Sequence, residues 1–249
     1  MVRFLAIQHT FSEFFGALEP RFEARDIAFT YLRPVTGQDV TAAAGQFDCL
    51  WLLGGAHPVA DREHCPWIED ELRLVTAFAR SRRPVVGLGF GAHVIAVAHG
   101  GAPRMDPEHD AYWTTAHATE AGRDDPLARA VDGRRVLVMT NGGVDLPSGL
   151  APVVVDERGR WIAIRPTPLA YGLTFRPELK PGMIEDMIME DDRPVPENIG
   201  ALLDEARVRW DETQETTARV IAALVEALDL MQERRKMPVF GLRPVKEEG

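Results

Sequence analysis

The segment "RPVVGLGFGAHVIAVAHGG", residues 83–101, contains the residues of this chain that most strongly suggest chemistry. Its pattern predicts a buried strand, a tight turn with several glycines and then an apolar helix. In a nucleophile elbow, a turn of this layout exposes one reactive side chain at the carboxyl edge of a sheet. The residue at the apex here is Gly89, which has no side chain. The turn therefore predicts an elbow without a nucleophile, or another use of the same backbone.

Nucleotide binding is one such use. Gly87, Gly89 and Ala92 satisfy the G-x-G-x-x-G/A pattern between a strand and a helix, which is the fingerprint of dinucleotide-binding folds. That fingerprint normally lies in the first strand–helix unit, with an acidic residue ending the next strand. Here it follows the third predicted strand, and Asp106 falls in "GGAPRMDPEHD", which we expect to be a loop.

A serine or cysteine hydrolase is a second possibility. Its nucleophile needs a histidine base within hydrogen-bonding distance. The chain has 7 histidines and none lies beyond His117, so a triad ordered as nucleophile and then distant histidine is excluded. We expect Cys49, in "FDCLWLL", to be buried in the core, and Cys65 to lie in a loop. Neither is expected to form a disulfide bond or to bind a metal.

The elements that must position this turn follow an α/β pattern. Apolar runs predict buried parallel strands at Val2–Ile7, Cys49–Leu53 and Val85–Leu88, with a helix between the last two. This order predicts an open, mainly parallel sheet with helices on both faces. Short segments near Ala111–His117, Arg135–Met139, Val153–Asp156, Trp161–Arg165 and Ala170–Phe175 predict a mixed or antiparallel extension of that sheet, with a hairpin around 157–159.

The chain becomes helical from Pro181 onward. We expect one domain over residues 1–190, and a C-terminal helical extension with a tail over residues 191–249 that packs on the same domain. The stripe of Trp210, Val220, Leu224 and Leu228 predicts internal packing of this extension, or a homodimer contact.

Composition limits the classes of function. The 249 residues carry a formal net charge of −10, which works against a nucleic-acid interface. No apolar run approaches the length of a membrane span, and the first residues lack the pattern of a signal peptide. We therefore expect a cytoplasmic protein without a membrane or nucleic-acid partner and without a cofactor.

Three blocks along the chain resemble class I glutamine amidotransferases of the short, free-standing kind. They are the segment from "FDCLWLLGGAHPVAD" onward, the turn at residues 83–101, and "AYGLTFRPEL" at residues 170–179. With "VDLPSG" at residues 144–149, the resemblance covers most of residues 1–190. It implies an α/β fold with flavodoxin-like layering.

Carried over position by position, this resemblance places a degenerate triad in the chain. The nucleophilic cysteine of the family falls on Gly89, its base histidine on Arg176 and its orienting glutamate on Glu178. The family segment that contains a polar histidine falls near "TNGG", residues 140–143, which has none. Without nucleophile and base, hydrolysis of glutamine should be slower by several orders of magnitude, since base catalysis alone contributes ~10²–10⁴-fold.

The same resemblance predicts where a ligand would bind. The backbone N–H groups of Gly55 and Phe90 correspond to the oxyanion donors, and the helix that begins near Gly91 favours an anion. The expected ligand-binding set is Gly55, Ala56, His57, Phe90, His93 and Arg176. Arg176 would either clamp an anion or form a salt bridge with Glu178. A metal held by His57, His93 and Glu178 lacks a ligand-spacing signature, so no metal site is expected.

Three hypotheses follow. The first is an amidotransferase-like protein that has lost glutaminase activity and keeps the fold as a small-molecule-binding, regulatory or partner-docking module. Its expected partners are a small anionic or glutamine-like ligand, a synthase, or a second copy of the chain. The second is an enzyme with repurposed chemistry, in which Arg176, His57, His93 and Glu178 act on an anionic substrate. It requires an open pocket and an Arg176 that is not paired with Glu178. The third is nucleotide binding at Gly87, Gly89 and Ala92.

Overall fold

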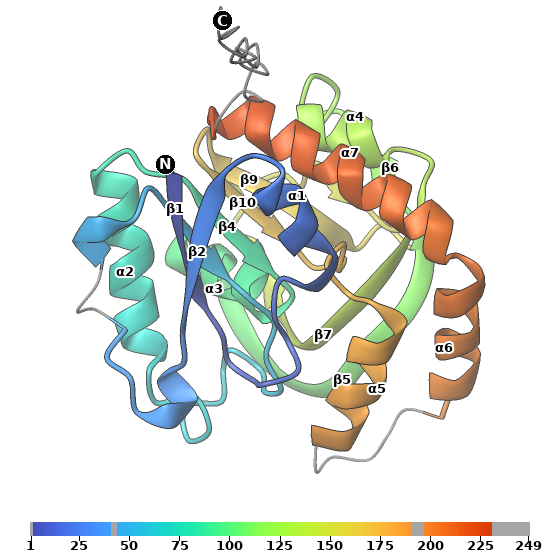
Figure 1. Ribbon diagram of the computed structural model, residues 1–249, viewed down its shortest axis with the longest axis horizontal. Coiled ribbons are helices and arrows are strands. Elements are labelled where there is room, and N and C mark those ends of the chain that lie inside the picture. Colours follow the sequence, from blue (N-terminus) through green and yellow to red (C-terminus); the bar gives the residue numbers. More distant parts are fainter. Residues whose placement is uncertain (1, 41–43, 191–196, 231–249) are drawn as a thin grey trace, which may run out of the picture.

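The central element is an eight-stranded sheet (Figure 1). The computed structural model describes residues 2–40, 44–190 and 197–230. The first five strands in the sheet order are mutually parallel, and the last three continue it antiparallel. The order is β2 (Ile27–Leu32), β1 (Val2–Ile7), β3 (Cys49–Leu52), β4 (Val85–Leu88), β10 (Ala170–Leu173), β9 (Trp161–Thr167), β8 (Val154–Val155) and β6 (His117–Ala118).

Both faces of the sheet are buried under helices, as the continuous apolar runs predicted. In β3, Cys49 and Trp51 join one hydrophobic cluster and Leu50 and Leu52 join another, because successive side chains point to opposite faces. The first cluster contains residues of α1 (Glu19–Glu23), α4 (Pro126–Val131) and α7 (Trp210–Leu228). The second contains residues of α2 (Ile68–Arg80) and α3 (Phe90–Ala98). The expected fold class is confirmed, and Cys49 is buried in the core.

Strand β2 was missed in the sequence. It lies at the edge of the sheet, and among the described strands it pairs with β1 alone. Four of its six positions are partly or fully exposed, so "IAFTYL" lacks the unbroken apolar run of a central strand. The glycine-rich turn consequently follows the fourth strand of the chain rather than the third.

Residues 102–145 correct two further expectations. The backbone of β5 (Ala102–Thr115) is a strand through the segment expected to be a loop, including Asp106. β5 pairs with β7 (Arg135–Asp145) up to Arg104 and again from His109, and the register shifts between these two residues. β5 and β7 also form a separate two-stranded sheet and do not extend the main one. The hairpin at residues 157–159 is confirmed by the antiparallel pairing of β8 with β9.

The C-terminal region consists of two helices that join at Arg209. α6 (Ile199–Val208) packs with α5 (Pro181–Glu190) against the β5–β7 ribbon, whereas α7 lies across the main sheet (Figure 1). Val220, Leu224 and Leu228 are buried in the first cluster, as the predicted packing stripe requires, whereas Trp210, the fourth residue of that stripe, is only partly buried and lies outside the cluster. Within the described part of the chain, no helix has the length and apolar character needed to cross a membrane. The predicted tail lies outside the described residues.

Candidate functional site

The turn between β4 and α3 has the sharp geometry of a nucleophile elbow. Gly89 adopts φ 53° and ψ −112°, a conformation that side-chain-bearing residues rarely adopt. Its N–H donates to the Leu173 carbonyl at 2.8 Å, which ties the apex to β10. A Cβ on Gly87 would collide with the backbone of Gly91, and a Cβ on Gly91 would collide with Leu52. Close packing thus accounts for these glycines without a bound nucleotide.

Arg176 fills the space in front of the apex. A Cβ placed on Gly89 would lie 2.9 Å from Nη1 of Arg176. The guanidinium donates from Nε to Glu178 Oε1 at 2.6 Å, from Nη2 to Glu13 Oε1 at 2.9 Å and from Nη1 to the Met139 carbonyl at 3.2 Å. Since all three nitrogens have partners and the residue is 4% exposed, Arg176 is not open to a ligand.

The charges around Arg176 stabilise one another in a buried environment. Burial acts to lower the pKa of Arg176, but the neighbouring charges of Glu178 and Glu13 raise it, so the guanidinium is permanently charged. Burial raises the pKa of Glu178 above its ordinary value, against the opposite effect of Arg176. Glu178 Oε2 makes no hydrogen bond within the described residues. Such a buried cluster is costly to disrupt, since losing one partner leaves an uncompensated charge.

A second buried ion pair lies beside the turn. His9 contacts Gly54 O through Nδ1 at 2.9 Å and Glu71 Oε1 through Nε2 at 2.8 Å. Both partners are acceptors when Glu71 is ionised, so the imidazole then carries a proton on each nitrogen. Burial acts to lower the pKa of His9, but the charge and hydrogen bond of Glu71, with the Gly54 carbonyl and the charge of Glu13, together raise the pKa above its ordinary value. The ring also packs against Phe90, with 4.6 Å between the ring centroids.

The predicted site residues fall into separate groups. Gly89, Arg176 and Glu178 lie together at the apex. Gly55 packs against Phe90 and His9, where an added Cβ would lie 3.1 Å from Phe90 Cγ. The partly buried Ala56 and His57 continue the loop after Gly55, and the ring of His57 stacks on His64.

His93 lines a different space, a cleft of about 480 Å³ between β7 and β9. Its imidazole is 3% exposed, yet Nδ1 has no hydrogen-bond partner within the described residues, and the same holds for the hydroxyl of Thr174, which is 4% exposed. Burial lowers the pKa of His93 to about 4, with a further contribution from the charge of Arg104 and an opposing backbone hydrogen bond with Asn141. The cleft is lined also by Tyr112, Val138, Thr140, Gly142, Gly143, Val144, Leu146 and Trp161.

The charges at this cleft are largely balanced. Arg104 forms an ion pair with Asp145, and Arg160 forms one with Asp156 at 2.9 Å. Trp161 donates from Nε1 to the Val144 carbonyl at 2.9 Å, which fixes the indole at the wall. His93 Nδ1 and the Thr174 hydroxyl are thus buried polar atoms at this cleft without a hydrogen-bond partner among the described residues, whereas most buried polar groups have one.

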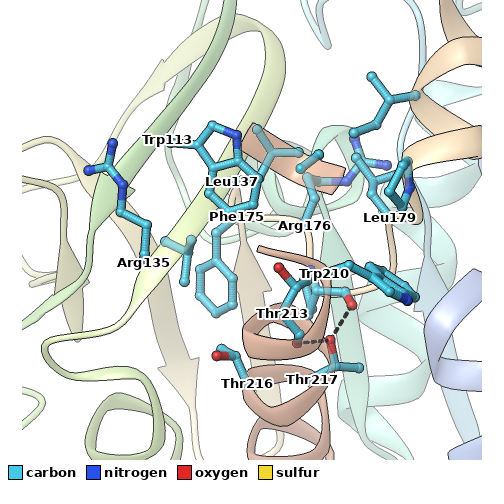
Figure 2. A pocket seen from close by; sticks show the side chains of 15 residues that line it. Trp113, Arg135, Leu137, Phe175, Arg176, Leu179, Trp210, Thr213, Thr216 and Thr217 are labelled. Carbon is cyan, nitrogen blue, oxygen red and sulfur yellow. Dashed lines mark hydrogen bonds between the residues drawn. The ribbon is translucent and has the colours of Figure 1, made fainter. Parts of the chain in front are cut away.

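A second cavity lies under α7, and Figure 2 shows Arg176 at its margin near Leu179, with Phe175 and Trp210 also in its wall. Its volume is about 20 Å³, which accommodates roughly one water molecule. Thr217 lines it but donates to the Pro177 carbonyl at 2.7 Å (Figure 2). This cavity is a packing void and not a ligand site.

Three charged residues at the site were missed in the sequence: His9, Glu13 and Glu71. The available signal was positional, because His9 and Glu13 follow the carboxyl end of a predicted parallel strand, the edge where sites of α/β proteins are located. Glu71 lies on α2 at a position that faces the core, and only the packing of α2 brings it to His9.

Comparison with known proteins establishes the fold. No protein-family model matches the sequence, and no curated protein matches it. Among solved structures, a glutamine amidotransferase from Thermotoga maritima is similar with a TM-score of 0.74 and 21% identity, over 90% of this chain and 98% of that chain. A glutamine amidotransferase from Methylobacillus flagellatus is similar with a TM-score of 0.76 and 20% identity, over 91% of this chain and 94% of that chain. The chain therefore has a glutamine amidotransferase-like α/β fold.

Proposed function

We propose that this protein is an amidotransferase-like module without cysteine-dependent glutaminase activity, which binds a small polar molecule in the cleft beside His93. The observation that carries the first part is the position of Arg176. Its guanidinium occupies the space that a side chain at position 89 would need, and two buried carboxylates hold it there.

The remaining cysteines support this proposal. A thioester intermediate requires a thiolate at the apex. Cys49 is fully buried on β3, and burial raises the pKa of its thiol well above the ordinary value. Burial likewise raises the pKa of Cys65 to about 12, and that residue precedes α2 rather than the elbow. Neither thiol is suited to act as a nucleophile at neutral pH.

The lining of the cleft supports one class of ligand. If Nε2 of His93 carries the proton that the Asn141 carbonyl accepts, Nδ1 is a hydrogen-bond acceptor. A ligand with an N–H or O–H donor would satisfy it, and the Thr174 hydroxyl can donate or accept. A volume of about 480 Å³ fits a molecule of amino-acid or nucleoside size. A neutral or zwitterionic ligand with a carboxamide, such as glutamine, combines these features. A strongly anionic ligand suits the cleft less well, because Arg104 and Arg160 already pair with Asp145 and Asp156.

The other two hypotheses lose their support. Repurposed chemistry at Arg176 required that residue to face an open pocket, but it is paired with Glu178 and 4% exposed. Nucleotide binding at the glycine-rich turn lacks its usual context, because Asp106 lies in β5 of the separate ribbon and does not end the next strand of the main sheet.

Glutaminase activity is tested first. We expect purified protein to release no ammonia from glutamine above background, and an electrophilic glutamine analogue to leave no covalent adduct detectable by mass spectrometry, while an active class I amidotransferase gives both. Ammonia release at an enzymatic rate, or an adduct on Cys49 or Cys65, would refute the proposal. The double variant Gly89→Cys with Arg176→His should also remain inactive, because it leaves Glu13 and Glu178 without their cation.

Ligand binding is tested separately by calorimetry with glutamine, asparagine and simple carboxamides. Replacing Thr174 by valine should weaken binding by roughly tenfold, the effect of one hydrogen bond. Thr216→Val is the matched control, since Thr216 is equally buried but bonds the Glu212 carbonyl within α7. Equal affinity of wild type and Thr174→Val, or no binding of any carboxamide at millimolar concentration, would place the ligand elsewhere or exclude this class.

A further inference from the structure

Two histidines and an aspartate converge in the loop between β3 and α2. His57, Asp61 and His64 each offer one ligand atom, and these three atoms lie within 4.8 Å of one another. All three residues lie in the turns of this loop, ahead of α2. No other cluster of at least three such groups occurs among the described residues.

The loop backbone holds this cluster in a compact form. The Asp61 N–H donates to the Pro58 carbonyl, and the Cys65 N–H donates to the Asp61 carbonyl, each at 3.0 Å. The carboxylate of Asp61 also accepts the His64 N–H at 3.2 Å. The three side chains are therefore presented by a folded turn, which lowers the entropic cost of bringing them to one ion.

The carboxylate of Asp61 lies where the two imidazoles meet. Its Oδ2 is 2.8 Å from Nδ1 of His64 and 3.7 Å from Nδ1 of His57. The two rings are stacked, with 4.5 Å between centroids and 9° between planes. The side chains of His57 and His64 are 35% and 56% exposed, so an ion from solvent can reach them and their rotamers can adjust.

We propose that His57, Asp61 and His64 form a binding site for a divalent transition-metal ion of the zinc type. Imidazole nitrogen suits zinc, copper and nickel, whereas calcium and magnesium prefer oxygen ligands. In a tetrahedral zinc site, ligand atoms lie about 3.3 Å apart, given metal–ligand distances near 2.0 Å. Small side-chain rotations contract the observed cluster to that size. Three protein ligands leave a fourth position for water or a group of a ligand.

The surroundings are compatible with a cation. Arg62, the nearest basic residue in sequence, pairs with Glu69 at 3.2 Å. The loop is also linked to the cleft: Asn141 donates to the Gly55 carbonyl at 2.9 Å, and a Cβ on Gly142 would lie 2.7 Å from Pro58. A metal ion here would stabilise the loop that packs on this wall of the cleft. The site does not depend on the proposed function.

The test uses full-length protein without an affinity tag, stripped with a chelator and titrated with Zn²⁺ in a calorimeter. We expect one Zn²⁺ per chain at the cluster, and at least 100-fold weaker binding in His57→Ala and in His64→Ala. Co²⁺ in place of Zn²⁺ should give the visible absorption of a four-coordinate site. The control is His117→Ala, which removes an exposed histidine on β6 and should leave affinity unchanged.

Two outcomes would overturn the proposal. One is the absence of saturable Zn²⁺ binding; the other is binding that persists in the double variant His57→Ala with His64→Ala, which would mean an adventitious site elsewhere. Unfolding curves of the metal-free variants check that the substitutions leave the fold intact. The same variants provide a readout independent of affinity, because Zn²⁺ should raise the midpoint of thermal unfolding of wild type but not of the double variant.

Discussion

Arg176 and Gly89 are complementary in shape: the guanidinium lies where the first atom of a side chain at position 89 would project, 2.9 Å from it. The pairing extends to Gly54, where a Cβ would collide with the Glu13 carboxylate and the same guanidinium. The absence of side chains at two glycines thus makes room for one buried ion cluster. Substitutions at Gly89 and Arg176 are consequently coupled.

Replacing Gly89 by alanine should destabilise the protein by more than the backbone strain of a positive φ alone. Backbone strain of this kind costs about 1–3 kcal/mol, and the contact with Arg176 adds to it. Gly133→Ala is the control, because Gly133 also has a positive φ, 71°, but an added Cβ would meet no atom within 4 Å. Urea unfolding of both variants gives the comparison. Equal losses would show that Arg176 does not pack against the apex.

Replacing Arg176 by methionine should cost about 3–5 kcal/mol of stability, because Glu13 and Glu178 then lose their buried counter-charge. Arg207→Met, which disrupts an exposed pair with Glu185, should cost far less, because exposed ion pairs contribute little to stability. Adding Glu13→Gln and Glu178→Gln to Arg176→Met should recover part of the loss, since no charge is then left unpaired. A triple variant less stable than Arg176→Met would contradict this account.

His93 should make the protein sensitive to acid. Its pKa is about 4 in the folded state and 6.5 ordinarily, so the unfolded state binds more protons between these values. Stability from this group is complete above pH 6.5 and decreases as the pH falls toward 4, by about 3 kcal/mol. Between pH 7 and pH 4, the free energy of unfolding should decrease in both wild type and His93→Leu, and the decrease should be about 3 kcal/mol smaller in His93→Leu. Parallel curves would show that His93 titrates normally.

His9 should have the opposite dependence. Because its folded-state pKa is raised above 6.5, its stabilisation is complete below pH 6.5 and is lost as the pH rises through the folded-state pKa. Glu71→Gln removes the carboxylate that raises this pKa. Wild type should therefore lose stability relative to Glu71→Gln as the pH rises above 6.5. An NMR titration of the His9 ring checks the cause directly, and an ordinary pKa in wild type would refute it.

The sequence determined the framework of this protein. Strands β1, β3 and β4 are buried on both faces, so each is a continuous apolar run, and the glycines of the turn are required by close backbone packing. The sequence offered a salt bridge between Arg176 and Glu178 as one of two roles for Arg176, because the two residues are two positions apart in an extended segment, and the structure contains this pair. Edge strand β2 was missed because its partly exposed pattern resembles a loop. Strands near Ala111–His117 and Arg135–Met139 were predicted, but the start of β5 was expected to be a loop and both strands were expected to extend the main sheet.

Only the tertiary structure decided which side chains share a site. Glu13 reaches Arg176 across 163 positions of sequence, and His9 reaches Glu71 across 62, through contacts that no local pattern encodes. The structure also separated residues that the sequence grouped, with Arg176 sealed at the apex and His93 in the cleft. Propensity and periodicity act over a few residues, whereas burial and electrostatic pairing depend on how distant elements pack. The site of this protein therefore depends on the packing of distant elements.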